Sequence, residues 1–118
     1  MNVKRGDIVL IDWPFSGGSG SKRRPALVVQ NDPDNARLTN VIVAMHTSLT
    51  RRAAVPTQML IEVTSAEGKA SGLRRDSVVN CANRFTVEQS KIIFAIGTLP
   101  PSLMQQVDQC LKVALALP

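Results

Sequence analysis

Short apolar segments rich in β-branched residues recur along most of the chain, and each has the length of a strand. They are Asp7–Trp13, Ala26–Gln30, Asn40–Met45, Thr57–Val63, Ser77–Cys81 and Ile92–Ile96. Turn-forming residues separate them at 16–21, 31–35 and 67–72. The pattern therefore predicts a mainly β fold with five or six strands.

The C-terminal segment changes from the period of a strand to that of a helix. Pro101 suits the first helical position, where a missing N–H removes no hydrogen bond. Apolar residues then recur on one helical face, namely Leu103, Val107, Leu111, Ala114 and Leu115. We expect a small closed barrel that carries one terminal helix. No linker, repeat or change of composition divides the chain, so residues 1–118 are predicted to form a single domain.

The charge of the chain indicates an acidic partner. Its formal net charge is +5, and seven of its fourteen basic residues lie in three clusters, at 22–24, 51–52 and 74–75. Clustered arginine is typical of phosphate binding. Any one cluster is explained as well by solvated loop charges, whereas three in a small domain favour a nucleic acid.

Cysteine and histidine are too scarce for common metal sites. With two cysteines, one histidine and no CxxC motif, a zinc site is not expected, nor is any cofactor. The N-terminal residues lack the apolar run of a signal peptide, and no stretch approaches the roughly 18 apolar residues of a membrane span. We expect a soluble cytoplasmic protein with reduced thiols and no membrane contact.

A basic segment beside a predicted strand is the first candidate for chemistry. Lys22, Arg23 and Arg24 follow a Gly/Ser-rich loop, and Pro25 is expected to fix the backbone just before the strand begins. The P-loop motif G-x-x-x-x-G-K-[ST] is absent. From the residues alone, a surface turn is as good an interpretation as a functional site.

The second candidate is the polar triplet His46, Thr47 and Ser48 at the end of a very apolar strand. A triplet there would lie at the rim of a barrel. Threonine in such a place often only caps a turn, and a single histidine is more often structural than catalytic. No neighbouring carboxylate suggests a catalytic triad.

Several short motifs follow one another at a characteristic spacing. They are Arg5-Gly6-Asp7-Ile8-Val9, Arg24-Pro25-Ala26-Leu27-Val28-Val29, Thr47, Val55-Pro56-Thr57, Gly72-Leu73-Arg74-Arg75-Asp76-Ser77-Val78-Val79, Thr86, Gly97-Thr98-Leu99 and Val107-Asp108. Each alone is weak, but their order is specific. Over nearly its whole length the chain resembles the MazF/PemK family of toxin–antitoxin endoribonucleases.

The resemblance implies an SH3-like β-barrel of the CcdB/PemK kind with a C-terminal α-helix. It also implies a homodimer that grips single-stranded RNA. A cognate antitoxin would cover the RNA groove with a disordered acidic tail, and DNA binding by that complex is a further expectation. By the same analogy, Arg24 and Thr47 form the catalytic pair, and Asn31 faces a base.

The implied chemistry suits these residue types. The 2′-OH of the RNA attacks the adjacent phosphorus, so the enzyme needs neither its own nucleophile nor a metal. Arg24 can stabilise the extra negative charge, and Thr47 can bond the phosphate or the 2′-OH. We expect further RNA contacts from Lys22, Arg23, Asn31, His46, Ser48, Arg51 and Asn83.

The chain departs from the family pattern at several positions. Ala82-Asn83 replaces a Glu-Gln or Asp-Gln pair, Asn80 replaces an arginine, and Gly20-Ser21 replaces a Glu-Gln pair in the first loop. These changes are expected to alter the cleavage sequence first. They leave the general acid and base unassigned, and His46 becomes a candidate because the usual histidine pKa suits proton transfer.

Two alternatives use the same fold without RNA cleavage. Gyrase-poisoning toxins of the CcdB kind act through a C-terminal Trp-Gly-Ile, whereas this chain ends Ala116-Leu117-Pro118 and has its only tryptophan at Trp13. An inactive RNA-binding module is the other alternative. The presence of Arg24 and Thr47 argues against it, and Ala82 keeps it open.

Overall fold

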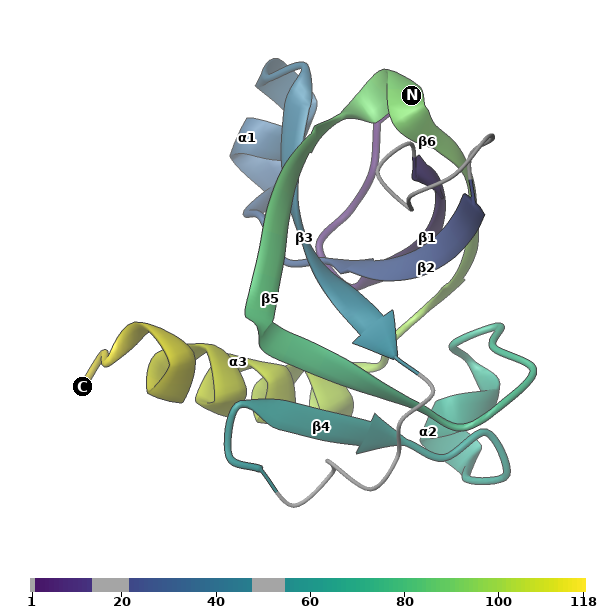
Figure 1. Cartoon of the computed structure of the whole chain (residues 1–118), viewed down its shortest axis with the longest axis vertical. Coiled ribbons are helices and arrows are strands. Elements are labelled where there is room, and N and C mark those ends of the chain that lie inside the picture. Colours follow the sequence, from purple (N-terminus) through teal and green to yellow (C-terminus); the bar gives the residue numbers. More distant parts are fainter. Residues whose placement is uncertain (1, 14–21, 48–54) are drawn as a thin grey trace.

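Six antiparallel strands form one sheet in the described residues, 2–13, 22–47 and 55–118, of this computed structural model (Figure 1). The strand order is β4-β5-β3-β2-β1-β6. Their bounds are β1 (Asp7–Trp13), β2 (Lys22–Val28), β3 (Asn40–Thr47), β4 (Gln58–Ile61), β5 (Ser77–Glu88) and β6 (Ile92–Thr98). The expectation of a mainly β fold is therefore confirmed.

The sheet is strongly curled. In Figure 1, β1, β2, β3, β6 and the second half of β5 wrap around a common interior, while β4 and the first half of β5 lie beside the terminal helix. Register shifts in the β1–β6 and β3–β5 ladders accompany this curl. Within the described residues, the ladders run from β4 to β6 without joining these two edge strands to each other.

Two hydrophobic clusters fill the two faces of the sheet, because side chains alternate along each strand. The inner cluster takes Val41, Val43 and Met45 from β3, and the outer one takes Ala44 from between them. The outer cluster packs against α3 (Pro101–Leu115), which buries Val107 there. Both cysteines are buried free thiols in this outer cluster.

Helix α3 begins at Pro101, as its sequence predicts, and ends at Ala116 in a left-handed conformation. Two short helices lie where turns are expected, α1 (Asp32–Arg37) and α2 (Ala66–Lys69), and η2 (Gln89–Lys91) joins β5 to β6. Asn31 and Ser65 cap the first two with their side chains. No helix in the described ranges has both the length and the apolar character needed to cross a membrane.

Two strands, β2 and β5, differ most from their predicted bounds, whereas β3, β4 and β6 differ by one or two residues at an end. β2 starts at Lys22 rather than Ala26, so Pro25 lies inside the strand and does not precede it. Pairing of this basic segment with β1, where Arg24 lies opposite Ile11, outweighs its weak local β preference. β5 continues past Cys81 to Glu88 because β3 pairs with it over that length.

Candidate functional site

The register between β2 and β3 brings Arg24 and Thr47 to the same place. The ladder pairs Ala26 with Met45, and two further residues along each strand set Arg24 opposite Thr47. Pro25 has no N–H to continue the ladder, so the hydrogen-bonded pairing ends beside it. Strand alternation places Arg24 and Thr47 on the face that carries Met45.

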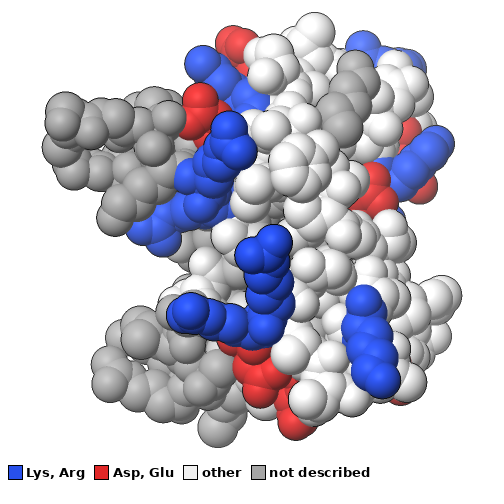
Figure 2. Space-filling view, turned by 90° about the vertical axis from the view of Figure 1, so that its right-hand side faces the viewer, with Lys and Arg blue, Asp and Glu red and all other residues white. Residues whose placement is uncertain are grey.

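A cavity of about 460 Å³ opens at these strand ends. Its walls are Arg23, Arg24, Pro25, His46, Thr47, Leu73, Arg75 and Ser77. Three guanidinium groups and no carboxylate line it, so it favours an anionic ligand. Figure 2 shows Lys and Arg side chains on both sides of a hollow in this charged face of the molecule.

Gly72 lies three residues before Arg75 and helps to direct Arg75 towards this cavity. Its φ is +74°, and a Cβ atom there would lie 1.8 Å from the Ile96 carbonyl oxygen, so only glycine fits. The close approach turns the chain after α2, and Leu73 and Arg75 then line the cavity. The sequence signals Arg75 by its basic cluster and Leu73 by its place in the motif at 72–79.

His46, which also lines the 460 Å³ cavity, is a buried residue. Its Nδ1 lies 3.1 Å from Ser77 Oγ, and its Nε2 has no hydrogen-bond partner among the described residues. Burial lowers the pKa of His46 to about 4, so the ring is neutral near pH 7. This value does not suit the proton transfer near neutrality for which the sequence made it a candidate. A neutral imidazole remains able to hydrogen-bond a ligand through Nε2.

A second, smaller cavity of about 240 Å³ shares part of this wall. It is lined by Arg24, Met45, His46, Thr47, Asn83 and Phe85. The structure therefore places Asn83, one of the predicted RNA contacts, beside Arg24 and Thr47. Phe85 was not foreseen, although the chain has only three phenylalanines and one tryptophan.

One predicted RNA contact, Asn31, lines neither of these two cavities. Asn31 caps α1, where its Oδ1 accepts a hydrogen bond from Asp34 N at 2.9 Å. The extended chain between Arg24 and Asn31 separates them by roughly 20 Å. Ser48, Arg51 and the side chain of Lys22 lie outside the described residues.

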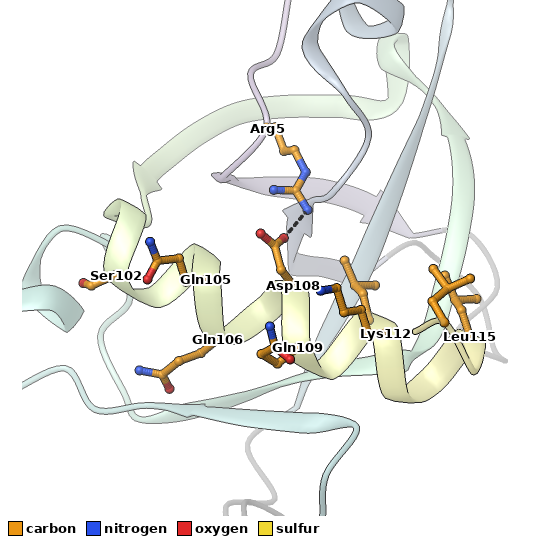
Figure 3. A pocket seen from close by; sticks show the side chains of 10 residues that line it. Arg5, Ser102, Gln105, Gln106, Asp108, Gln109, Lys112 and Leu115 are labelled. Atoms are coloured by element: carbon orange, nitrogen blue, oxygen red, sulfur yellow. Dashed lines mark hydrogen bonds and ion pairs between the residues drawn. The ribbon is translucent and has the colours of Figure 1, made fainter.

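A larger cavity, of about 760 Å³, lies along α3 and differs in character (Figure 3). Arg5 reaches into it and donates to Asp108 Oδ1 at 2.7 Å and to the Val29 carbonyl at 2.8 Å. Most of its other polar groups are glutamine and serine side chains of α3. Across the described part of the chain, no three His, Cys, Asp or Glu side chains gather to hold a metal ion.

Comparison with known sequences gives one result over the whole chain. Residues 4–115 match the family described as PemK-like, MazF-like toxin of type II toxin-antitoxin system. Endoribonuclease MazF6 of Mycobacterium tuberculosis is 40% identical over 119 residues, which cover 99% of this chain and 100% of the relative. Endoribonuclease EndoA of Bacillus subtilis is 35% identical, with 99% and 97% covered.

Solved structures agree with this fold. An endoribonuclease in complex with its cognate antitoxin, from a mycobacterial species, has a TM-score of 0.80 and 22% identity, covering 98% of this chain and 97% of that one. The M. tuberculosis toxin MazF-mt6 has a TM-score of 0.76 and 25% identity, covering 95% and 98%. These likenesses extend over both the curled sheet and the terminal helix.

Proposed function

The chain belongs to the PemK-like, MazF-like family of type II toxin–antitoxin toxins, and on that premise we propose that it is an endoribonuclease that cuts single-stranded RNA. It acts on messenger RNA at specific sequences, and so inhibits translation and growth. The observation that carries this proposal is the meeting of Arg24 and Thr47 at a cavity lined by two more arginines.

The proposed reaction uses the 2′-oxygen of the RNA as nucleophile. A bond forms between the 2′-oxygen and phosphorus as the bond from phosphorus to the 5′-oxygen breaks. The 2′-OH loses its proton and the leaving 5′-oxygen gains one, giving a 2′,3′-cyclic phosphate and a 5′-OH. Arg24 donates two hydrogen bonds to the phosphate as negative charge accumulates, and Thr47 aligns the 2′-OH or the phosphate.

In this proposal, the other residues around the cavity at the ends of β2 and β3 hold the RNA. Arg23 and Arg75 contact neighbouring phosphates, and His46, as a neutral ring, offers Nε2 as a hydrogen-bonding atom. The positions of Lys22 next to Arg23 and of Ser48 and Arg51 after Thr47 in the sequence support the same role for them. Asn31 is left out because it caps α1 at the other end of β2.

A homodimer and an antitoxin are the proposed protein partners. Val113, Leu115 and Leu117 are 53%, 46% and 56% exposed at the end of the chain, although the rest of the apolar helix face packs on the sheet. Exposed leucine and valine of this kind support a second subunit. The basic cavity is suited to the acidic tail of an antitoxin, and one structural neighbour was solved with its cognate antitoxin.

We further propose that the curled sheet is an SH3-like barrel and that residues 1–118 are one toxin domain acting in the cytoplasm. The curl of β1, β2, β3, β5 and β6 in Figure 1, with its register shifts, supports the barrel. The match over residues 4–115 supports a single domain.

The deciding experiment is cleavage of a mixed-sequence single-stranded RNA with EDTA present. Discrete fragments that end in 2′,3′-cyclic phosphate or 3′-phosphate, and that are lost in Arg24→Ala and Thr47→Ala, are expected. Arg37→Ala and Thr39→Ala are the matched controls, because both residues are exposed and lie just before β3, at the opposite end of that strand from Thr47. A DNA copy of the substrate should stay intact, since it lacks the 2′-OH.

Intact RNA that still binds the protein tightly would overturn the enzymatic proposal in favour of an RNA-binding module. Cleavage that is equally strong in both alanine variants would leave an endoribonuclease but refute this site. The first outcome tests whether the protein cleaves RNA, and the second tests whether Arg24 and Thr47 form the active site.

A further inference from the structure

β5 contains a bulge close to Arg24 and Thr47, the proposed catalytic pair. Consecutive residues Ala44 and Met45 of β3 lie opposite Arg84 and Asn80 of β5, so residues 81–83 form the bulge between these pairs. Three hydrogen bonds hold it in shape. Cys81 N donates to the Thr57 carbonyl at 2.9 Å, Ala82 N donates to Asn80 Oδ1 at 3.0 Å, and Arg84 donates to the Cys81 carbonyl. The bulge is thus a fixed part of the sheet.

The bulge sets Asn83 and Phe85 beside Arg24 and Thr47. Phe85 lies opposite Val43 and so points to the face that carries Met45 and Thr47. Arg24, Met45, Thr47, Asn83 and Phe85 all line the 240 Å³ cavity, and Met45 is only 6% exposed. Phe85 is 37% exposed, and Asn83 is exposed as well.

This combination of groups matches the chemistry of an unpaired nucleobase. Proteins that recognise single-stranded RNA stack splayed bases on aromatic rings and bond the base edges with amides. The exposed Phe85 ring, in a cavity that Met45 also lines, provides a stacking surface, and the Asn83 amide offers both a donor and an acceptor. The cavity is smaller than the usual pocket for a drug-sized ligand, so it suits a single base.

We propose that Phe85 and Asn83 form a nucleobase subsite, in which a base next to the scissile phosphate stacks on Phe85 and bonds Asn83. The position relative to the phosphate rests on the proposed function, because Arg24 and Thr47 define where that phosphate lies. Phe85 gives affinity for any base, since every base has a π-face, and Asn83 gives the preference among bases.

The test uses 2-aminopurine, a fluorescent base analogue whose emission is quenched when it stacks on an aromatic ring. A change in its fluorescence therefore reports stacking directly. Single-stranded oligonucleotides with 2′-fluoro sugars carry one 2-aminopurine at successive positions and resist cleavage because they have no 2′-OH. We expect the protein to change the fluorescence at one or more positions. Phe85→Leu should abolish that change and weaken binding about tenfold, while Phe85→Trp should retain both. Phe94→Leu is the matched control, because Phe94 is 46% exposed on β6 and lies outside both cavities.

The two proposals fail in different ways. Cleavage of ordinary RNA with a fluorescence change that Phe85→Leu leaves intact would refute the subsite and keep the endoribonuclease. A fluorescence change that depends on Phe85, in a protein that cleaves no RNA, would keep the subsite and refute the endoribonuclease. Equal loss of binding in Phe85→Leu and Phe94→Leu would also count against the subsite, since it would show no special role for the ring beside Arg24.

Discussion

The cavity at the ends of β2 and β3 and the cavity along α3 use arginine in opposite ways. Along α3, Arg5 is joined to Asp108 and to the Val29 carbonyl, and its donors hold the helix against the N-terminal part of the chain (Figure 3). At the strand ends, Arg23, Arg24 and Arg75 line one cavity. The ion pairs formed between described residues, Arg5–Asp108 and Arg37–Asp34, include none of these three.

The proposed function uses the smaller of these two cavities, because the two differ in charge as well as in size. The α3 cavity is the larger of the two, yet two of its three charged groups, Arg5 and Asp108, form an ion pair, and Lys112 is the third. The strand-end cavity has three arginines and no carboxylate among its described lining residues, so positive charge is in excess there. Uncompensated charges that are close together destabilise a fold slightly, and an anionic ligand would relieve that cost.

The largest expected effect comes from changing the shape, and not the charge, of the key arginine. Arg24→Lys keeps one positive charge but loses the planar fork that bonds two phosphate oxygens. RNA cleavage should fall roughly 100- to 1000-fold, whereas Arg5→Lys, with the same chemical change along α3, should leave it unaltered. Initial rates on a labelled RNA measure both. Equal loss in the two variants would remove the distinction between the cavities.

A second large effect concerns the buried imidazole at the strand ends. The pKa of His46 is about 4 in the folded chain and 6.5 as its ordinary value, so the unfolded chain takes up the proton first as the pH falls. The neutral ring therefore contributes stability that is complete above pH 6.5 and is lost between about 6.5 and 4, on the order of 2–3 kcal/mol. Denaturant titrations across that pH range should show this loss in the wild type and a flatter profile in His46→Gln.

Two carboxylates of α1 titrate below that pH range. Hydrogen bonds from Arg5 N and Asn31 lower the pKa of Asp32 and Asp34, respectively, below 3.8. The pH–rate profile of cleavage should be unchanged in His46→Gln, because a ring with this pKa has no step near neutrality. Loss of an acidic limb near pH 6.5 in that variant would instead assign His46 a proton in the reaction.

The sequence predicted the strands and the terminal helix well because their signals are local. Alternation of apolar residues and a proline at the first helical position act within a few residues of one another. The predicted start of β2 was wrong because it depends on pairing with another strand, β1, and not on a local signal. Its basic residues have little β preference, and only the pairing of Arg24 with Ile11 makes them a strand.

The site was predictable only in part, because its geometry depends on contacts between residues that are far apart in the sequence. Arg24 and Thr47 were named through motifs, but their meeting depends on the β2–β3 register, which no local pattern encodes. Phe85 reaches the cavity through the bulge at 81–83, which shifts the pairing by three residues and has no sequence signal of its own. For Asn31 the structure shows a capping role on α1, and its contact with a base stays a prediction.

A moderate effect on stability alone should come from the α3 region. Arg5→Met removes the bonds to Asp108 and Val29 but keeps much of the side chain's length. Because both charged groups are partly exposed, at 29% and 44%, the free energy of unfolding should fall by only about 1–2 kcal/mol. Urea denaturation measures this, and the cleavage rate of the folded variant should match the wild type. A large loss of cleavage would mean that the α3 cavity takes part in RNA binding.

The smallest effect offers the finest test, because it compares two adjacent arginines. Arg75 lines the strand-end cavity and Arg74, its exposed neighbour in sequence, does not. Arg75→Gln should weaken RNA binding several-fold and reduce the slope of log affinity against log salt by about 1, as expected when one phosphate contact is lost. Arg74→Gln removes the same charge and should change that slope less, because its effect is only long-range and is screened by salt. Binding of an uncleavable 2′-fluoro RNA at several salt concentrations measures both slopes. Equal slopes in the two variants would mean that the net charge of this face matters, and not the geometry that Gly72 imposes on the chain leading to Arg75.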